Sequence, residues 1–169
     1  MKVALGEHDF KETSMVANSM NKIDNINGAS AEKIMDEISL RQPFFLSALL
    51  GLHFDISKVE HEEIIKIYLL IWEYFKIKPK VQSVKITQKS FEDRCLKNTH
   101  MFKYVEGEQN KSAKKEIYAN DLQKVKSKAL LTMIILRFNT QPLLQDMNPE
   151  IKGMIMIGIK SFIECFETI

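Results

Sequence analysis

The distribution of apolar positions predicts three helices that are hydrophobic around most of their circumference. They span residues 64–75, 129–138 and 151–166. A helix that is apolar on nearly every side either packs against neighbours on several sides or lies in a membrane. Charged residues interrupt the first and third segments, whereas a transmembrane helix needs about 18 or more apolar residues with few charges. The pattern therefore predicts core helices of a soluble protein and no association with a membrane.

The clearest helix start lies just before the first of these segments. Ser57 and Glu60 form a capping box, in which the hydroxyl and the carboxylate each accept a hydrogen bond from an unpaired backbone N–H group. The box predicts a helix over residues 58–76. Its charged positions fall in one narrow stripe, with Leu69 in the middle of the stripe. We expect this helix to be surrounded on nearly every side except that stripe.

Capping residues and prolines predict the remaining helices. The expected starts are Ser30, Pro43, Ser90, Ser112 and Asn148. The helix from Ser112 is expected to continue without interruption to about residue 136. Residues 78–87 are rich in lysine and are predicted to form a linker rather than a short strand.

These elements predict an all-α protein of about six helices in a compact orthogonal or bundle-like domain. Residues 1–28 are polar and rich in asparagine, so we expect a loosely ordered segment with one short helix near residues 10–20. Residues 29–169 form the single helical domain. Gln42-Pro43 and Gln141-Pro142 each precede a short apolar segment and a long apolar helix. This similarity reflects either two similar helical units related by duplication or the general likeness of apolar helices.

Composition narrows the class of protein further. The chain has 169 residues, of which 45% are hydrophobic and 27% charged, as expected for one globular domain. Its two cysteines, Cys95 and Cys165, are too few for a disulfide framework. We therefore expect a reducing compartment, and the cytoplasm as the location.

Positive charge is concentrated in the middle of the chain. Residues 76–128 hold 14 basic and 6 acidic side chains, although the whole chain has a net charge of only +2. A lysine-rich helix face could bind a nucleic-acid backbone without reading sequence. The candidate residues are Lys111, Lys114, Lys115, Lys124, Lys126 and Lys128. The chain has few arginines, which favours a solvated helix face as the alternative.

The densest cluster of possible metal ligands lies in residues 53–63. It contains His53, Asp55, Glu60, His61, Glu62 and Glu63. Its spacing matches neither a His-Glu-x-x-His motif nor a di-iron bundle, and adjacent residues point in different directions around a helix. An acidic first helical turn, which the helix dipole favours, is the alternative. We predict no metal and no cofactor.

Catalytic motifs are not evident elsewhere. Cys95 and His100 would lie about 140° apart on a helix and so would not face each other. Glycine-rich phosphate-binding loops are absent from the sequence. The sequence therefore favours a protein that is not an enzyme.

The apolar helix surface exceeds what one small core readily absorbs, which favours association. The leading hypothesis is a non-enzymatic interaction protein that acts as a homodimer or with a protein partner. The expected interface residues are Leu69, Met156, Ile159 and Ile163. The alternative is an accessory, sequence-independent nucleic-acid binder. A metal-dependent enzyme around residues 53–63 is the third hypothesis.

Overall fold

The computed structural model describes residues 7–169, and within this range every regular element is helical. The α-helices are α1 (Glu7–Asp24), α2 (Gly28–Arg41), α3 (Pro43–Gly51), α4 (Lys58–Phe75), α5 (Pro79–Ser83), α6 (Gln88–Gly107), α7 (Lys111–Lys124), α8 (Lys128–Thr140), α9 (Pro142–Gln145) and α10 (Pro149–Thr168). A short 3₁₀ helix, η1 (Leu52–Phe54), follows α3. The all-α prediction is confirmed. The predicted count of six is wrong, because short helices and a helix break raise the number among the described residues to ten.

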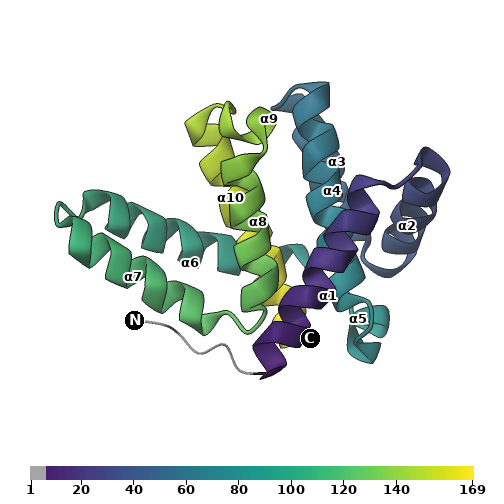
Figure 1. Cartoon of the computed structure of the whole chain (residues 1–169), viewed down its shortest axis with the longest axis horizontal. Helices are drawn as coiled ribbons and strands as arrows, with labels where there is room; N and C mark the ends of the chain where they lie inside the picture. Colours follow the sequence, from purple (N-terminus) through teal and green to yellow (C-terminus); the bar gives the residue numbers. More distant parts are fainter. Residues whose placement is uncertain (1–6) are drawn as a thin grey trace.

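Helix α4 lies at the centre of the packing, and its start is the predicted one. The Ser57 N–H donates to Glu60 Oε2 at 2.7 Å, and the Glu60 N–H donates to Ser57 Oγ at 3.4 Å. Helices α1, α2, α3, α8, α9 and α10 all pack against α4 (Figure 1). Leu69 is only 1% exposed, so the middle of the charged stripe is covered as well.

Helix α1 provides part of this cover. Val16, Met20 and Ile23 are buried and follow the three- to four-residue spacing of one helix face. This face packs against α4 and α8. The N-terminal helix is thus longer than the one predicted near residues 10–20. It is also packed more extensively than its polar composition indicates, because three apolar residues suffice to hold one face.

The long helix predicted from Ser112 to residue 136 is interrupted at residues 125–127. Val125 has extended backbone angles and is 1% exposed, and the Ser127 N–H donates to Glu167 Oε1 at 2.7 Å. Burial of one side chain and this hydrogen bond to the last helix favour the break. As a result α7 turns back along α6, and these two helices project side by side beyond the rest of the molecule (Figure 1).

The predicted linker over residues 78–87 contains α5 and an extended segment that one buried glutamine holds in place. Gln42 is 1% exposed, and its Nε2 donates to the carbonyl oxygens of Val81 and Val84 at 2.8 and 2.7 Å. Its Oε1 accepts the Ile86 N–H at 2.9 Å. A single side chain therefore satisfies three backbone groups, one in α5 and two in the extended segment that follows it.

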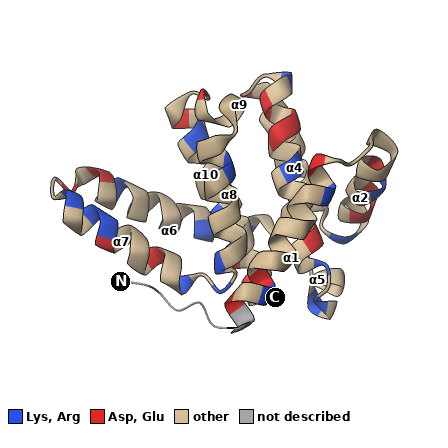
Figure 2. Cartoon of the chain, in the orientation of Figure 1, with Lys and Arg blue, Asp and Glu red and all other residues tan. Residues whose placement is uncertain are grey.

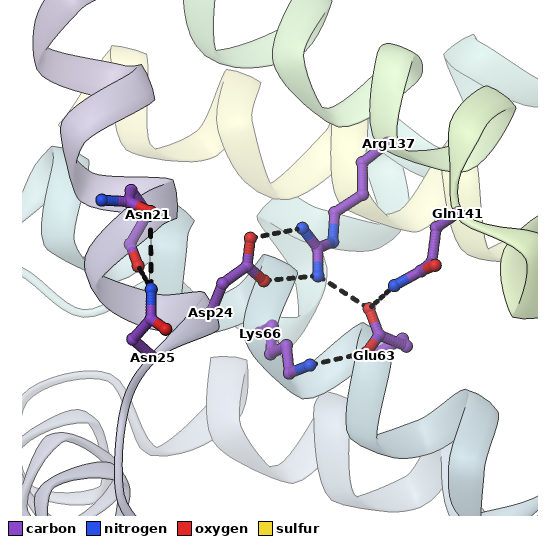
Figure 3. Close-up of polar contacts among 7 residues, drawn as sticks. All are labelled: Asn21, Asp24, Asn25, Glu63, Lys66, Arg137 and Gln141. Carbon is purple, nitrogen blue, oxygen red and sulfur yellow. Dashed lines mark hydrogen bonds and ion pairs between the residues drawn. The ribbon is translucent and has the colours of Figure 1, made fainter.

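A cluster of charged side chains joins α1, α4 and α8 (Figure 3). Arg137 binds both carboxylate oxygens of Asp24, at 3.1 and 2.7 Å, and also donates to Glu63 Oε2 at 2.7 Å. Lys66 and Gln141 donate to Glu63 at 2.6 and 3.1 Å. Burial alone would raise the pKa of Glu63, but the hydrogen bonds from Lys66, Gln141 and Arg137 outweigh it and lower this pKa.

The glycines of α10 lie where α6 crosses it. A Cβ atom added at Gly153 would stand 4.0 Å from Phe102 Cζ, and one added at Gly158 would stand 3.9 Å from Phe91 Cζ. Both distances are ordinary van der Waals contacts. The crossing therefore leaves room for a methyl group at either position.

Replacing Arg137 by methionine should destabilise the fold in a pH-dependent way. Because the pKa of Glu63 is lower in the folded than in the unfolded chain, its ionised form stabilises the fold above the unfolded pKa of about 4.3. This contribution is lost as the pH falls through the folded pKa. We expect Arg137→Met to lower the free energy of unfolding at pH 7 by about 3 kcal/mol, and by less at pH 4.

Urea denaturation at both pH values measures this effect. The control is Arg41→Met, since Arg41 is exposed and makes one bond of 3.4 Å to the Gln82 carbonyl oxygen. We expect that control to stay within about 0.5 kcal/mol of the wild type. Equal stability of Arg137→Met and the wild type at pH 7 would contradict the role given to the cluster.

Replacing Gly158 by alanine should stabilise the protein. Alanine loses less backbone entropy than glycine when a helix forms, and the added methyl group fits the space below Phe91. We expect the free energy of unfolding to rise by about 0.5–1 kcal/mol, measured by urea denaturation. A fall in stability would mean that α6 and α10 pack more closely at Gly158 than the 3.9 Å distance to Phe91 Cζ indicates.

Candidate functional site

Two grooves flank the crossing of α6 and α10. Groove A has a volume of about 1160 Å³ and lies between α3 with η1, α6 and α10. Groove B has a volume of about 620 Å³ and lies between α6, α7, α8 and α10. Phe102, which lies over Gly153, lines both grooves and separates them. Groove A is the candidate functional site, because it is the larger and its lining includes unpaired polar groups.

The walls of groove A come from one face of α6 and one of α10. On α6 the lining residues recur every three or four positions, as in Phe91, Cys95, Thr99 and Phe102. Thr87 begins this helix by accepting the Ser90 N–H at 3.1 Å, so the start lies three residues before the predicted one. The α10 wall is formed by Ile151, Met154, Ile155, Ile157, Gly158 and Phe162.

Tyr68 of α4 lies at the floor of groove A. It is 3% exposed, and its ring stacks on Phe45 with 4.8 Å between the centroids. Within residues 7–169 no hydrogen bond involves its hydroxyl group. Burial, with a smaller effect from Cys95, raises the pKa of Tyr68 well above its usual value. The hydroxyl therefore stays protonated and is a hydrogen-bond donor without a partner in the described chain.

Cys95, on the α6 wall, lies in surroundings that disfavour its thiolate form. The thiol is free and half-buried, and burial raises its pKa. A raised pKa favours the neutral thiol, whereas nucleophilic cysteines are thiolates stabilised by nearby positive charge. His100 is exposed and points away from this wall by its position on α6. Burial therefore keeps the Cys95 thiol in its neutral form.

The opening of groove A is bordered by charged residues from three elements. Asp55 follows η1, Lys103 and Glu106 belong to α6, and Glu150 lies in the first turn of α10. All four are exposed, and none of the three carboxylates forms an ion pair within the described residues. The border therefore carries a formal charge of −2 around an apolar interior.

Groove B contains a buried polar cluster that has a structural role. The Lys160 ammonium contacts Asn98 Oδ1 at 2.5 Å, Glu164 Oε1 at 2.9 Å and Asp121 Oδ2 at 3.0 Å. Asn98 Nδ2 donates to Ser161 Oγ at 3.0 Å. All three ammonium hydrogens thus have an acceptor. The cluster ties α7, through Asp121, to α6 and α10.

The predicted interface residues lie mostly in the interior. Leu69, Ile159 and Ile163 are at most 1% exposed and form part of the core, and only Met156 is partly exposed, in the wall of groove B. The prediction identified apolar faces but not the helices that cover them. The apolar surface that remains accessible includes Met154, which is 51% exposed in the wall of groove A.

The six candidate lysines form two groups at opposite ends of α7. Lys111, Lys114 and Lys115 lie at its start, whereas Lys124 ends it, Lys126 lies in the connection to α8 and Lys128 is the first residue of α8. Lys114 is half-buried, and the other five are exposed. Thirteen residues at 1.5 Å each place the two ends about 20 Å apart. Acidic residues lie between the two groups (Figure 2).

The predicted histidine and carboxylate cluster does not converge on one point. His53 Nδ1 lies 2.6 Å from the Leu50 carbonyl oxygen, and His61 Nε2 lies 2.9 Å from that of Leu49. Glu60 caps α4, and Glu63 binds Arg137. In the part of the chain that the structure describes, no group of three or more His, Cys, Asp or Glu residues is placed to hold a metal ion. Across the same residues, no helix combines the length and apolar character that a membrane span requires.

Sequence reasoning missed groove A, although two signals were present. The α6 face with Phe91 and Phe102 recurs at helical spacing, and Gly153 and Gly158 provide small residues on α10. Together these features are typical of a helix crossing. Comparison of the chain with protein-family models, curated proteins and solved structures finds no match.

Replacing Lys160 by methionine should loosen α7. The change leaves Asp121 and Glu164 as buried like charges, so we expect a loss of about 3 kcal/mol in the free energy of unfolding. Hydrogen exchange measured by mass spectrometry should be faster in α7 of the variant than in α7 of the wild type, whereas exchange in α4 should change less. Unchanged protection of α7 would show that Lys160 does not hold this helix in place.

Proposed function

We propose that this protein is a non-enzymatic interaction protein whose groove A receives an amphipathic helix of a protein partner. The observation that carries the proposal is an apolar groove of about 1160 Å³ that the chain's own helices leave unfilled. Pockets for small molecules usually measure about 300–1,000 Å³ and enclose most of their ligand. Groove A is larger, and exposed residues such as Gly51, Met154 and Glu150 border it.

The dimensions of the groove suit a helix. Its α6 wall extends from Phe91 to Glu106, which corresponds to about 22 Å along the helix axis. A partner helix of about 14 residues has this length. Helix-in-groove recognition uses apolar side chains that recur every three or four residues. Met154 supports such recognition, because methionine side chains adapt to varied apolar surfaces.

Two other hypotheses from the sequence compete with this proposal, a homodimer and a nucleic-acid binder. A second copy of the chain would cover groove A in a homodimer, whereas the proposal expects a monomer of 19.6 kDa by light scattering. A mass of twice that value would make the second copy the occupant. Nucleic-acid binding by the lysines is the alternative function. The separation of these lysines into two groups gives it less support.

A designed peptide can test the proposal. The probe is a fluorescein-labelled 16-residue helix with leucine on one face and alternating lysine and glutamate on the other, so its polar face has no net charge. The matched peptide has the same composition in scrambled order, which removes the apolar face. Fluorescence anisotropy should show binding of the amphipathic peptide and much weaker binding of the scrambled one.

Two protein variants locate the binding surface. Met154→Glu places a charge in the wall of groove A and should weaken binding by about tenfold or more, because the charge would lose water on contact with leucine. Leu136→Glu is the matched control, since Leu136 is 53% exposed on α8 and lines neither groove. Equal binding of both peptides, or equal binding by Met154→Glu and the wild type, would contradict the proposal.

A further inference from the structure

We infer that the partner helix is basic and presents a hydrogen-bond acceptor to Tyr68 from within its apolar face. This inference rests on the proposed function and specifies the chemistry of the partner. Two independent observations carry it: the hydroxyl group of Tyr68 in the lining of groove A, which has no hydrogen-bond partner within the described residues, and the carboxylates around the opening, which form no ion pair there.

The hydroxyl of Tyr68 at the floor of the groove needs a hydrogen-bond acceptor from the partner. Tyr68 is 3% exposed, and within the described residues its hydroxyl has no hydrogen-bond partner. Water in the groove can reach this hydroxyl, but a helix that fills the groove would remove that water, and a buried polar group left unpaired costs about 1–3 kcal/mol. The ring is fixed between Phe45 and Phe162, at centroid distances of 4.8 and 6.0 Å. Because the ring cannot readily turn away, the acceptor has to come to the hydroxyl.

A side-chain amide is the acceptor that fits a helix. Backbone carbonyl groups of a helix are already paired within it, apart from the last turn. A carboxylate would enter an apolar floor close to three other carboxylates. An asparagine or glutamine in the apolar face can place its carbonyl oxygen at Tyr68 without bringing a charge into the groove. We therefore assign this role to one amide residue in an otherwise aliphatic stripe.

The border of the groove selects the charge of the partner. Asp55, Glu106 and Glu150 come from three different walls, and among the described residues that line the groove Lys103 is the single basic one. Within residues 7–169 these exposed carboxylates have no ion-pair partner, so their negative charge is not neutralised by a neighbouring side chain and can attract a basic occupant of the opening. Complementary charge at the rim of an interface raises the association rate and fixes orientation. Lysine or arginine beside the apolar stripe matches this border.

Three peptides with the same length and leucine face test the inference. The first has lysine throughout its polar face, and the second has glutamate there. The third is the lysine peptide with its central leucine replaced by asparagine. At 50 mM NaCl the lysine peptide should bind at least about tenfold more tightly than the glutamate peptide, and the difference should shrink at 500 mM because salt screens exposed charges.

Charge-neutralised variants test whether the carboxylates at the border cause the preference for the lysine peptide. The double variant Glu106→Gln with Glu150→Gln should lose most of the preference for lysine. Glu116→Gln, on the exposed surface of α7 outside groove A, is the matched control and should keep it. An unchanged preference in the double variant would overturn the role given to the border.

Tyr68→Phe removes the hydroxyl group and keeps the ring, so it tests the role of the hydroxyl alone. It should bind the asparagine peptide about fivefold to tenfold more weakly than the wild type does, whereas it should bind the lysine–leucine peptide at least as tightly as the wild type does. The leucine peptide thereby shows that the variant is folded and that its groove is intact. Equal binding of the asparagine peptide by both proteins would overturn the role given to Tyr68.

Different results would contradict the inferred partner chemistry and the proposed function of groove A. If the peptides bind in a manner sensitive to Met154→Glu but without the charge or amide preference, the inference is wrong and the proposed function stands. If no amphipathic peptide binds, or if binding is insensitive to Met154→Glu, the proposed function is wrong.

Discussion

The burial of α4 is the constraint on which the rest of the structure depends. This helix is apolar on nearly every side, and the buried positions among its 18 residues include the continuous run from Ile67 to Trp72. Six helices pack against it to remove that surface from water. Helix α10 is one of them, and its opposite face is left to α6. Helix α6 packs on that face of α10, and grooves A and B lie on either side of this contact.

Two buried cations hold the helices around this core in place. Arg137 joins α8 to α1 and α4 through Asp24 and Glu63, and Lys160 joins α10 to α6 and α7 through Asn98 and Asp121. Buried ion pairs add little net stability on average, but loss of one partner is costly. They therefore favour one arrangement of helices over others. In the second cluster this arrangement is also what keeps α6 and α7 beside groove B.

The sequence predicted the features that depend on local interactions. The capping box of Ser57 and Glu60, the helix starts at Pro43 and Asn148, and the all-α class follow from contacts within a few residues. Features that depend on distant residues were missed. Ser127 stops a helix by binding Glu167, and Arg137 pairs with Asp24, which lies 113 positions earlier. Periodicity shows which helix face is apolar, but it does not show which neighbour covers that face.

Because periodicity does not show which helix covers an apolar face, most of the predicted interface residues turned out to lie in the core. Leu69, Ile159 and Ile163 lie on apolar faces that other helices of the chain cover completely. Tyr68 and Met154 are part of equally ordinary apolar stretches in the sequence. Only the crossing of α6 and α10 distinguishes them, since it leaves one hydroxyl and one methionine facing an open groove.

The most direct test of the account is an NMR titration of the isotope-labelled protein with the lysine–leucine peptide. The account predicts that the largest backbone shift changes occur around groove A, at Gly51, Phe102 and Met154, with small changes on the outer surface of α7. Changes centred on α7 or on α2, or none at peptide concentrations that saturate the anisotropy signal, would contradict the claim that groove A is the binding surface.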